Sequence, residues 1–284
     1  MPSQAEKAEQ FRNLHRQEGP LVLPNAWDVP SARLFEDAGF PAVATSSAGL
    51  MVSHGYPDGQ VMPKRELFSA IDRIARVLSV PLSADVVAGY GRGAGGVAAT
   101  VRRVIEAGAV GINLEDHDPG GERLFPLAAQ VRKIRAVREV ANATGVPLVI
   151  NARTDALTLD GAPEKLLGEA IRRGRAYRDA GADCVYPMRL TDAASIGTFV
   201  QALQHPVNVM VRKGLPPIAE LRRLGVKRVS FGPSASYATF GLLKRASTEI
   251  LTSGTYETLT EGAISFQELN SLATARSTGT LPPE

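Results

Sequence analysis

The sequence predicts an α/β fold of the closed (β/α)8 type, a TIM barrel, and three observations lead to this prediction. One unit recurs along the chain: a short apolar run rich in Val, Ile and Ala, a loop, and a segment of helical periodicity. Glycine follows several of these segments, as in "LFEDAGF" and "YRDAGAD", where the chain must leave a helix. Continuous apolar strands that alternate with helices indicate a parallel sheet covered by helices, and eight such units favour a closed barrel over an open sheet. The eight predicted strands are residues 21–26, 42–47, 81–86, 110–115, 147–153, 183–188, 207–211 and 228–232.

A long helical segment follows the eighth predicted strand, at residues 232–254, and a shorter one follows at residues 266–272. No low-complexity stretch or linker divides the chain. We therefore expect residues 1–284 to form a single barrel domain with a C-terminal helical extension that begins at about residue 233.

The composition is that of a soluble globular protein, with 44% hydrophobic residues, 21% charged residues and a net charge of +3. No stretch reaches the roughly 18 apolar residues of a membrane span, and no basic run is interleaved with aromatic residues. We expect neither a membrane nor a nucleic-acid partner. The single cysteine, Cys184, excludes an internal disulfide, and the polar first residues contain no apolar leader, so a cytoplasmic location is expected.

Polar residues gather where the predicted strands end, which is where TIM barrels carry their active sites. They are Asn25, Trp27 and Asp28, then Ser46, Ser47 and Gly49, then Asp85, then Glu115, Asp116 and His117, then Arg153 and Asp155, and finally Arg212. Asp85 and Glu115 follow adjacent strands, so their carboxylates should lie close together, and their repulsion must be offset by a cation. Oxygen ligands with room for water suit Mg²⁺, with Mn²⁺ as the alternative ion. The structural alternative is an internal ion-pair network of Asp85, Glu115 and Arg153 that closes the barrel.

Arg153 is expected to face the same cavity, where a guanidinium beside a divalent ion can clamp a carboxylate. The hydroxyl and backbone N–H groups of "TSSAGL" (45–50) offer a second anion site. The cavity therefore suits a small carboxylate substrate such as a 2-oxo acid. Polarising the keto oxygen of such a ligand stabilises an enolate, which is what breaking the adjacent C–C or C–P bond requires.

The glycine-rich stretch "GRGAGG" (91–96) has a competing interpretation as a phosphate-binding turn of a dinucleotide fold. Asp85 lies just before this turn and would repel a phosphate, and two β/α units precede a motif that normally opens its fold. We therefore interpret the glycines as a flexible exit from the third strand, which lets Asp85 face the metal.

Five motifs, in this order and spacing, resemble the isocitrate lyase/phosphoenolpyruvate mutase superfamily over about residues 10–250. They are "NAWD" (25–28), "TSSAGL" (45–50), "ADVVAGYG" (84–91), "NLED" (113–116) and "NARTDA" (151–156). The resemblance implies a barrel with a protruding eighth helix that is exchanged between subunits of a homo-oligomer, either a dimer or a tetramer. It also implies Mg²⁺ and chemistry on 2-oxo or 2-hydroxy acids through an enolate.

The resemblance also implies roles for individual residues. Asp85 corresponds to the direct metal ligand and a contact to the substrate, Glu115 and Asp58 to second-sphere or water-mediated ligands, and Arg153 to the clamp on the substrate carboxylate. The substrate-binding segment corresponds to Ser46, Ser47, Ala48 and Gly49, with Trp27 as an aromatic wall. From the residues alone, Asp58 could equally cap the turn before Gly59.

The sequence departs from the family pattern in three places. Val87 stands where family members often carry a second acid, and Pro187 and Met188 stand where the phosphonate enzymes have a histidine after the sixth strand. The loop after the fourth strand, "DHDPGGERLFPL", lacks both the cysteine of the isocitrate-type lyases and the lysine of the phosphonate enzymes. His117, Asp118, Glu122 and Arg123 are that loop's candidates for an acid or base, and Tyr90 and Tyr186 are further candidate proton donors. The candidate catalytic residues are thus Arg153, Glu115, His117 and Arg123, although His117 could be a solvated loop residue.

The function predicted from these residues is that of a Mg²⁺-dependent carbon–carbon lyase or decarboxylase. Its substrate would be a small 2-oxo or 2-hydroxy carboxylic acid, cleaved through a metal-bound enolate. One alternative is a C–P bond enzyme, a mutase or hydrolase, of the same superfamily. Another is a barrel that binds a 2-oxo acid without turning it over.

Overall fold

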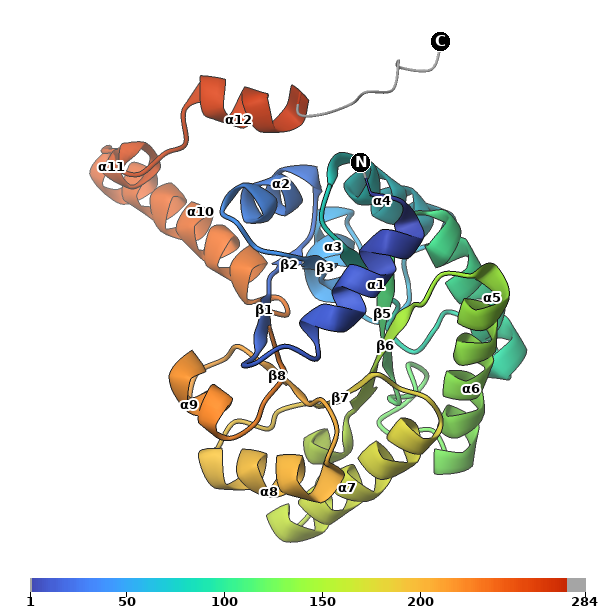
Figure 1. The fold of residues 1–284 in the computed structure, drawn as a ribbon. Helices are drawn as coiled ribbons and strands as arrows, with labels where there is room; N and C mark the ends of the chain where they lie inside the picture. Colours follow the sequence, from blue (N-terminus) through green and yellow to red (C-terminus); the bar gives the residue numbers. More distant parts are fainter. Residues whose placement is uncertain (1, 275–284) are drawn as a thin grey trace.

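The computed structural model describes residues 2–274, and the last part of the predicted domain lies outside the described residues. Strands and helices alternate along the chain (Figure 1). The strands are β1 (Leu21–Leu23), β2 (Asn25–Ala26), β3 (Val43–Thr45), β4 (Leu82–Asp85), β5 (Gly111–Glu115), β6 (Val149–Thr154), β7 (Cys184–Pro187), β8 (Asn208–Met210) and β9 (Arg228–Ser230). The helices are α1 (Gln4–Leu14), α2 (Val29–Asp37), α3 (Ser47–Ser53), α4 (Lys64–Val77), α5 (Gly93–Glu106), α6 (Leu127–Thr144), the 3-10 helix η1 (Ala156–Thr158), α7 (Pro163–Asp179), α8 (Ala193–Leu203), α9 (Ile218–Arg223), α10 (Ser234–Ser253), α11 (Glu257–Thr260) and α12 (Phe266–Thr274).

The strands close into a parallel barrel. β2 to β7 pair in sequence order, β1, β9 and β8 form a second ladder, and a bridge between Val185 and Val207 joins β7 to β8. β1 and β2 are two halves of one barrel strand, interrupted at Pro24, which has no N–H to donate to a ladder. β1 pairs with β9 and β2 pairs with β3, so this strand changes partner at the proline and closes the ring. The predicted TIM barrel is confirmed, and the strand predicted at residues 21–26 is corrected to two short strands.

Asn25 stabilises the closure of the barrel at its carboxyl end by hydrogen bonds to both flanking strands. Its Nδ2 donates to the carbonyl of Thr45 at 2.8 Å, on the β3 side. Its Oδ1 accepts from the backbone N–H groups of Phe231 and Gly232, both at 2.9 Å, just beyond β9. The first polar residue of "NAWD" therefore joins the two strands that flank its own.

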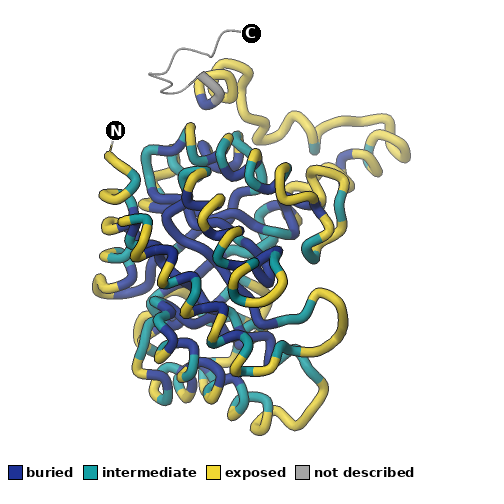
Figure 2. The backbone as a smooth tube through the Cα atoms, turned by 90° about the vertical axis from the view of Figure 1, so that its right-hand side faces the viewer, coloured by how far each residue is buried: buried dark blue, intermediate teal, exposed yellow. Residues whose placement is uncertain are grey.

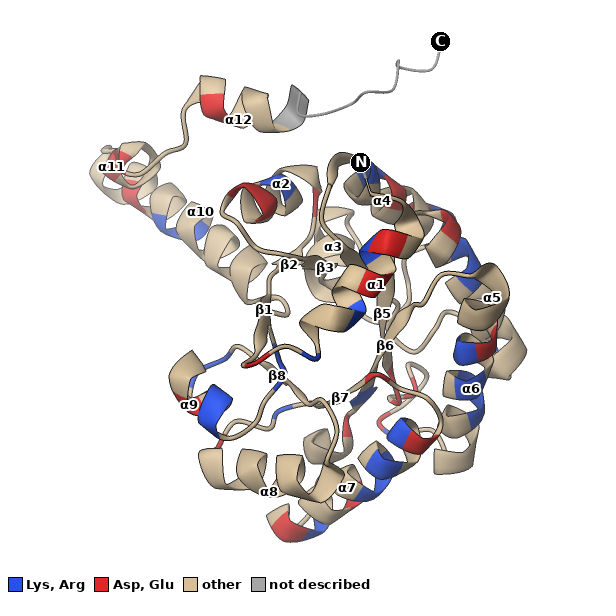
Figure 3. Ribbon diagram, in the orientation of Figure 1, with Lys and Arg blue, Asp and Glu red and all other residues tan. Residues whose placement is uncertain are grey.

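The outer helices bury one face against the barrel. In α4 the buried residues Leu67, Ala70, Ile71 and Ile74 recur at helical spacing. Acidic and basic residues both occur along α4 to α7, with basic residues in the majority on α6 (Figure 3). No helix among the described residues is both long and apolar enough to cross a membrane.

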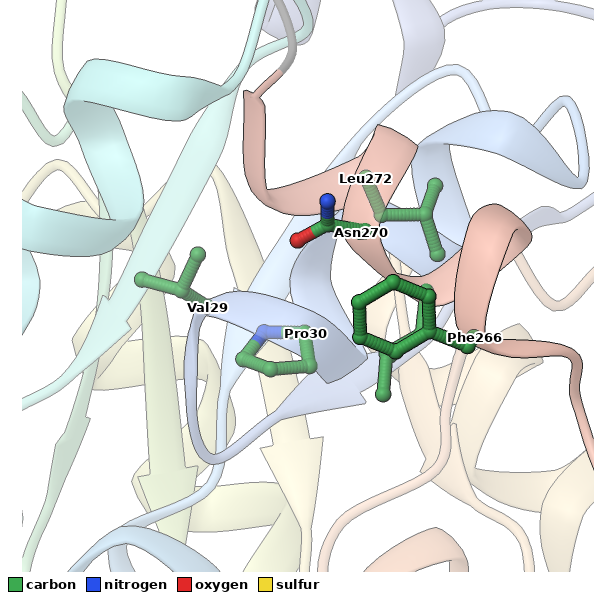
Figure 4. Close-up of a pocket in the computed structure, with 6 residues that line it drawn as sticks. Val29, Pro30, Phe266, Asn270 and Leu272 are labelled. Carbon is green, nitrogen blue, oxygen red and sulfur yellow. The ribbon is translucent and has the colours of Figure 1, made fainter.

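The eighth helix of the barrel pattern, α10, projects away from the barrel instead of packing beside it (Figures 1 and 2). It starts at Ser234, two residues later than predicted, and exposes apolar side chains such as Leu251, which is 86% exposed. α12 then folds back over α2, where Val29, Pro30 and residues of α12 line an apolar cavity of about 300 Å³ (Figure 4). The protruding helix is as predicted, and its exchange between subunits stays a prediction.

Helix α1 covers the amino end of the barrel. Phe11 on this helix is fully buried and packs against the start of β5, where a side chain on Gly111 would come within 2.5 Å of the Phe11 ring. His15 is buried beside Phe11, with its Nδ1 2.8 Å from the Phe11 carbonyl and the two rings edge to face at 4.8 Å. Burial, together with the charge of Arg228, lowers the pKa of His15 to about 3.

We expect His15 to make the fold sensitive to mild acid. Between pH 6.5 and 3 the unfolded chain binds a proton at His15 that the folded chain does not, so stability falls as the pH drops through this window. The free energy of unfolding should be lower by about 2 kcal/mol at pH 5 than at neutral pH because of this residue. The free energy of unfolding in urea is measured at pH 7.5 and at pH 5. Between these two pH values it should fall by about 2 kcal/mol less in His15→Gln than in the wild type.

His54 supplies the control for this measurement, because its Nδ1 makes the same contact, at 2.8 Å, with the carbonyl four residues earlier but the residue is exposed. His54→Gln should lose stability with pH as the wild type does. An unchanged pH dependence in His15→Gln would contradict the prediction.

Candidate active site

Three candidate site residues lie side by side on neighbouring strands. Glu115 on β5 is in register with Arg153 on β6, and Arg153 is in register with Tyr186 on β7, so all three point to the same face. Asn113, two residues before Glu115, shares this face, and its Oδ1 accepts from Arg228 Nη2 of the distant strand β9 at 3.2 Å. A bond between strands that are not neighbours in the sheet must cross the barrel interior. These side chains therefore point inward.

Arg153 holds two carboxylates at once. Its Nη1 lies 2.7 Å from Glu115 Oε2, while its Nη2 and Nε donate to Asp155 Oδ1 at 2.7 and 3.2 Å. The guanidinium also lies over the ring of Tyr186, with Cζ 5.9 Å from the ring centroid. Burial opposes the charged form of the guanidinium, but the two carboxylates raise the pKa of Arg153 well above its ordinary value.

Asp85 stands at the end of β4, beside Asn113 of β5. The N–H of Val87 donates to its Oδ1 at 3.0 Å, and the Val87 carbonyl accepts from the N–H of Glu115 at 2.9 Å. Val87 adopts a φ of +51°, a left-handed conformation that is unfavourable for a β-branched residue. This strained turn connects Asp85 to Glu115, the two acidic residues predicted to bind a metal.

The acidic residues of this cluster are short of compensating charge. Burial raises the pKa of Asp85, and burial raises the pKa of Glu115 to about 8 despite the nearby charge of Arg153. Asp155 is also buried, and its Oδ2 has no hydrogen-bond partner. The buried carboxylates of Glu115 and Asp155 and the partly buried carboxylate of Asp85 thus share one guanidinium, an arrangement that a bound cation would stabilise.

This arrangement fits an ion that needs few protein ligands. Within the part of the chain that the structure describes, no three His, Cys, Asp or Glu side chains are grouped closely enough to form a metal cage. Mg²⁺ typically takes one or two carboxylates and completes its shell with water and substrate oxygens. Asp85 and Glu115 match that mode of binding.

The predicted substrate-binding segment forms the start of α3. Ser46 caps this helix, its Oγ accepting from the N–H of Gly49 at 3.3 Å, and the N–H of Ser47 is directed at Asp85. A Cβ on Gly49 would lie 3.0 Å from Trp27 Cβ and 2.9 Å from Ser236 Oγ, so this glycine permits close packing of Trp27 and the start of α10. Ala48 is buried within the same turn.

The remaining predicted residues lie farther out. Asp58 is exposed, although its charge still reaches Asp85 and Glu115. His117 forms an antiparallel bridge with Leu124 at the base of the loop after β5. Arg123 is exposed and pairs with Asp118 at 3.2 Å within that loop. The structure therefore brings Asp85, Glu115 and Arg153 together, while Asp58, His117 and Arg123 lie at the rim or on the loop.

Two residues that support the site, Asp155 and Asp116, had no role predicted from the sequence. Asp155 accepts two hydrogen bonds from Arg153 and so fixes the orientation of its guanidinium. Asp116 is fully buried and accepts from the Asp155 N–H at 2.8 Å, from Tyr177 Oη at 2.6 Å and from Arg173 at 3.1 Å, so it fixes the turn after β6. Asp155 and Asp116 belong to quoted motifs, which is the signal that could have identified them.

The glycines of "GRGAGG" have a packing role. A Cβ on Gly91 would lie only 2.2 Å from the Gly96 backbone, so the loop and the first turn of α5 approach too closely for side chains. The interpretation of these glycines as a flexible exit is thus refined, because close backbone contact explains Gly91 and Gly96.

Comparison with known proteins identifies the family. Residues 11–251 match the phosphoenolpyruvate phosphomutase family. The chain belongs to this family. The chain is 34% identical to 2-methylisocitrate lyase of Escherichia coli K12 over 206 residues, which cover 69% of this chain and 67% of that protein. It is 28% identical to 2,3-dimethylmalate lyase of Eubacterium barkeri over 93% of both chains.

A solved structure extends this similarity to the fold. A lyase/mutase crystal structure from Burkholderia cenocepacia J2315 superimposes with a TM-score of 0.88 at 37% identity, covering 96% of this chain and 97% of that chain. The resemblance inferred from the five motifs is confirmed. The two lyases named above are carbon–carbon lyases, so these comparisons favour the lyase prediction over the C–P alternative.

Proposed function

We propose that this protein is a Mg²⁺-dependent carbon–carbon lyase or decarboxylase of small 2-oxo or 2-hydroxy carboxylic acids. The observation that carries the proposal is the cluster of Asp85, Glu115, Arg153 and Asp155, in which Glu115 and Asp155 are buried and acidic charge exceeds basic charge. The names of the two lyase relatives support the same class of substrate.

Each residue of the cluster has a proposed part in the reaction. Asp85 and Glu115 would hold Mg²⁺, which supplies Lewis-acid polarisation of the substrate oxygens. Arg153 binds the substrate carboxylate, and Asp155 keeps the guanidinium oriented. Tyr186 keeps its proton because burial raises its pKa, so its hydroxyl can donate to oxygen charge that develops during bond cleavage. The turn at Ser46, Ser47, Ala48 and Gly49, with Trp27 beside it, would enclose the substrate.

A substrate panel tests the proposal. Oxaloacetate, 2-alkylmalates, 2-methylisocitrate and phosphonopyruvate are incubated with the enzyme, with and without Mg²⁺, and pyruvate or other oxo-acid products are measured. Mg²⁺-dependent cleavage of a carboxylic acid supports the lyase, and turnover of phosphonopyruvate alone would replace it with the C–P enzyme. Thermal stabilisation by every acid without turnover would indicate a non-catalytic binder.

Val87 offers a second test, which concerns the metal. An aspartate tolerates the left-handed conformation at this position better than valine and adds a carboxylate near Asp85. We expect Val87→Asp to bind Mg²⁺ about tenfold more tightly by calorimetry, because ligand charge sets the affinity of such sites. Val87→Asn relieves the same strain without adding charge. Equal affinities for these two variants would contradict the prediction.

We also propose that the protein is a cytoplasmic homo-oligomer. Exposed apolar side chains along the C-terminal helices support this, with Leu251 86% and Phe266 77% exposed. Cys184 is buried and unpaired, as expected in a reducing compartment. Light scattering should give a mass of two or four chains, and a monomer would contradict this part of the proposal.

A further inference from the structure

The hydroxyl group of Tyr186 lies beside two methionine sulfur atoms. Its Oη is 3.1 Å from Met188 Sδ and 3.1 Å from Met210 Sδ. Met188 directly follows β7 and Met210 ends β8, so both residues belong to the carboxyl end of the barrel, where TIM barrels carry their active sites. Tyr186 is only 4% exposed, whereas both methionines are partly exposed. A buried hydroxyl of the proposed site thus has thioethers as its hydrogen-bond partners.

The backbone fixes both methionines in place. The N–H of Met188 donates to the carbonyl of Thr154 on β6 at 2.9 Å, and Arg189 then adopts a φ of +66°, so the chain leaves the strand direction directly after Met188. Met210 lies against the turn after β9, where a Cβ on Gly232 would come within 2.2 Å of the Met210 sulfur. Glycine at position 232 leaves the space that this sulfur occupies. The position of each sulfur atom therefore follows from the backbone around it.

The chemistry of sulfur determines what these contacts can do. A thioether is a weak hydrogen-bond acceptor and has no proton to donate, so the Tyr186 hydroxyl can only donate in both contacts. Burial raises the pKa of Tyr186 despite the positive charge of Arg153, so the hydroxyl keeps its proton at neutral pH. An oxygen that becomes negative during bond cleavage is a much stronger acceptor, because hydrogen bonds to charged groups are about twice as strong as neutral ones. The sulfurs thus orient the proton without holding it tightly.

We propose that Met188 and Met210 are positioning residues, which hold the Tyr186 hydroxyl as a hydrogen-bond donor and leave its proton available to the substrate oxygen that becomes negative. The inference rests on the lyase function proposed above and deepens it, because it names the groups that prepare the proton donor of that site. It also gives a role to Met188, which lies at one of the departures from the family pattern. An amide or carboxylate in either place would bind the proton more strongly and withhold it from the substrate.

Steady-state kinetics of the full-length protein with Mg²⁺, on whichever acid of the panel it cleaves, test the proposal first. Tyr186→Phe should lower kcat about a hundredfold, since the donor is lost. The double variant Met188→Leu/Met210→Leu roughly keeps the side-chain volumes but removes both acceptors. We expect it to lower kcat about fivefold with KM unchanged, because the hydroxyl then rotates and points toward the substrate for less of the time.

The decisive comparison repeats the two leucine substitutions in the Tyr186→Phe protein. There the leucines should have no effect on kcat, because no hydroxyl remains to be oriented. A fivefold loss that persists in the phenylalanine protein would show that the methionines act by packing, and it would overturn the proposal. Met62→Leu is the matched control, since Met62 is 1% exposed and packs in the apolar core, and it should leave kcat unchanged.

Glutamine at position 210 tests whether the weakness of the sulfur acceptor matters. Met210→Gln offers an amide oxygen, a stronger acceptor on a side chain of similar length, so the hydroxyl should be held away from the substrate. We expect kcat to fall about tenfold in Met210→Gln and about twofold in Met210→Leu. A glutamine variant that is as fast as the leucine variant would overturn the proposal.

The near-ultraviolet absorption of Tyr186 tests the contacts without turnover. The spectrum of this residue is obtained by subtracting the spectrum of the matching Tyr186→Phe protein, and a hydroxyl that donates a hydrogen bond absorbs at longer wavelength than a free one. We expect the band to move to shorter wavelength when both methionines are leucine. An unchanged band would reject the positioning role even in an active lyase. A shifted band in a protein that cleaves none of the acids would reject the lyase function instead, while the contacts between Tyr186 and the sulfurs would stand.

Discussion

Asp85→Asn should abolish Mg²⁺-dependent turnover, lowering kcat/KM by about a thousandfold or more, because the carboxylate proposed to bind the ion is lost. The same change should leave the fold as stable as the wild type, or more stable. Burial raises the pKa of Asp85, so the folded protein carries this charge at a cost that asparagine removes. Asparagine retains an oxygen that can accept from the Val87 N–H, so the turn after β4 keeps its hydrogen bond.

The assay pairs turnover with urea unfolding of the metal-free protein. Asp28→Asn is the control, since Asp28 also follows a barrel strand but caps α2, with its Oδ1 accepting from the Ser31 N–H at 2.8 Å. That variant should retain both activity and the cap. Wild-type turnover in Asp85→Asn would remove the metal hypothesis, and a loss of activity that merely follows unfolding would remove the assignment of Asp85 to the reaction.

The barrel could be predicted from the sequence because its signals are local. Each strand is a short apolar run followed by a helical period, and the end of a parallel strand identifies which side chains gather at the active end. Asp85, Glu115 and Arg153 were identified in this way, and the structure places all three inside one end of the barrel. The division of the first strand at Pro24 was also visible in the sequence, as a residue without an N–H inside an apolar run.

Long-range contacts could not be predicted in the same way. Arg228 begins β9 and is fully buried, and its bond to Asn113 depends on two strands meeting across the barrel, which no local pattern encodes. Burial lowers the pKa of Arg228 to about 10, and its Nε and Nη1 atoms have no hydrogen-bond partner. A polar cavity lined by Gln60, Tyr90, Asp118 and Lys133 is similar, because its walls come from four separate segments. Such groups are identified only when the fold brings them together.

Arg153→Lys should lower kcat/KM by about a hundredfold, mainly through a higher KM, because a single ammonium cannot reproduce the fork of the guanidinium. In the wild type that fork contacts Glu115 on one side and Asp155 on the other, each at 2.7 Å. Lysine keeps the positive charge but can satisfy only part of this geometry. Alanine would be a poor choice here, since it leaves two buried carboxylates without a cation, which costs about 3–5 kcal/mol and would confuse binding with unfolding.

Arg138→Lys is the matched control for this substitution. The Arg138 side chain is 20% exposed, the same as that of Arg153, and its guanidinium also spans several acceptors, including Asp183 and the Gly181 carbonyl at the opposite end of the sheet. Both lysine variants should therefore lose stability to a similar extent in urea, by about 1–2 kcal/mol. KM should rise in Arg153→Lys alone. A shared loss of stability with an unchanged KM in both variants would assign Arg153 to the structural ion-pair network that closes the barrel, and its proposed contact with the substrate would be rejected.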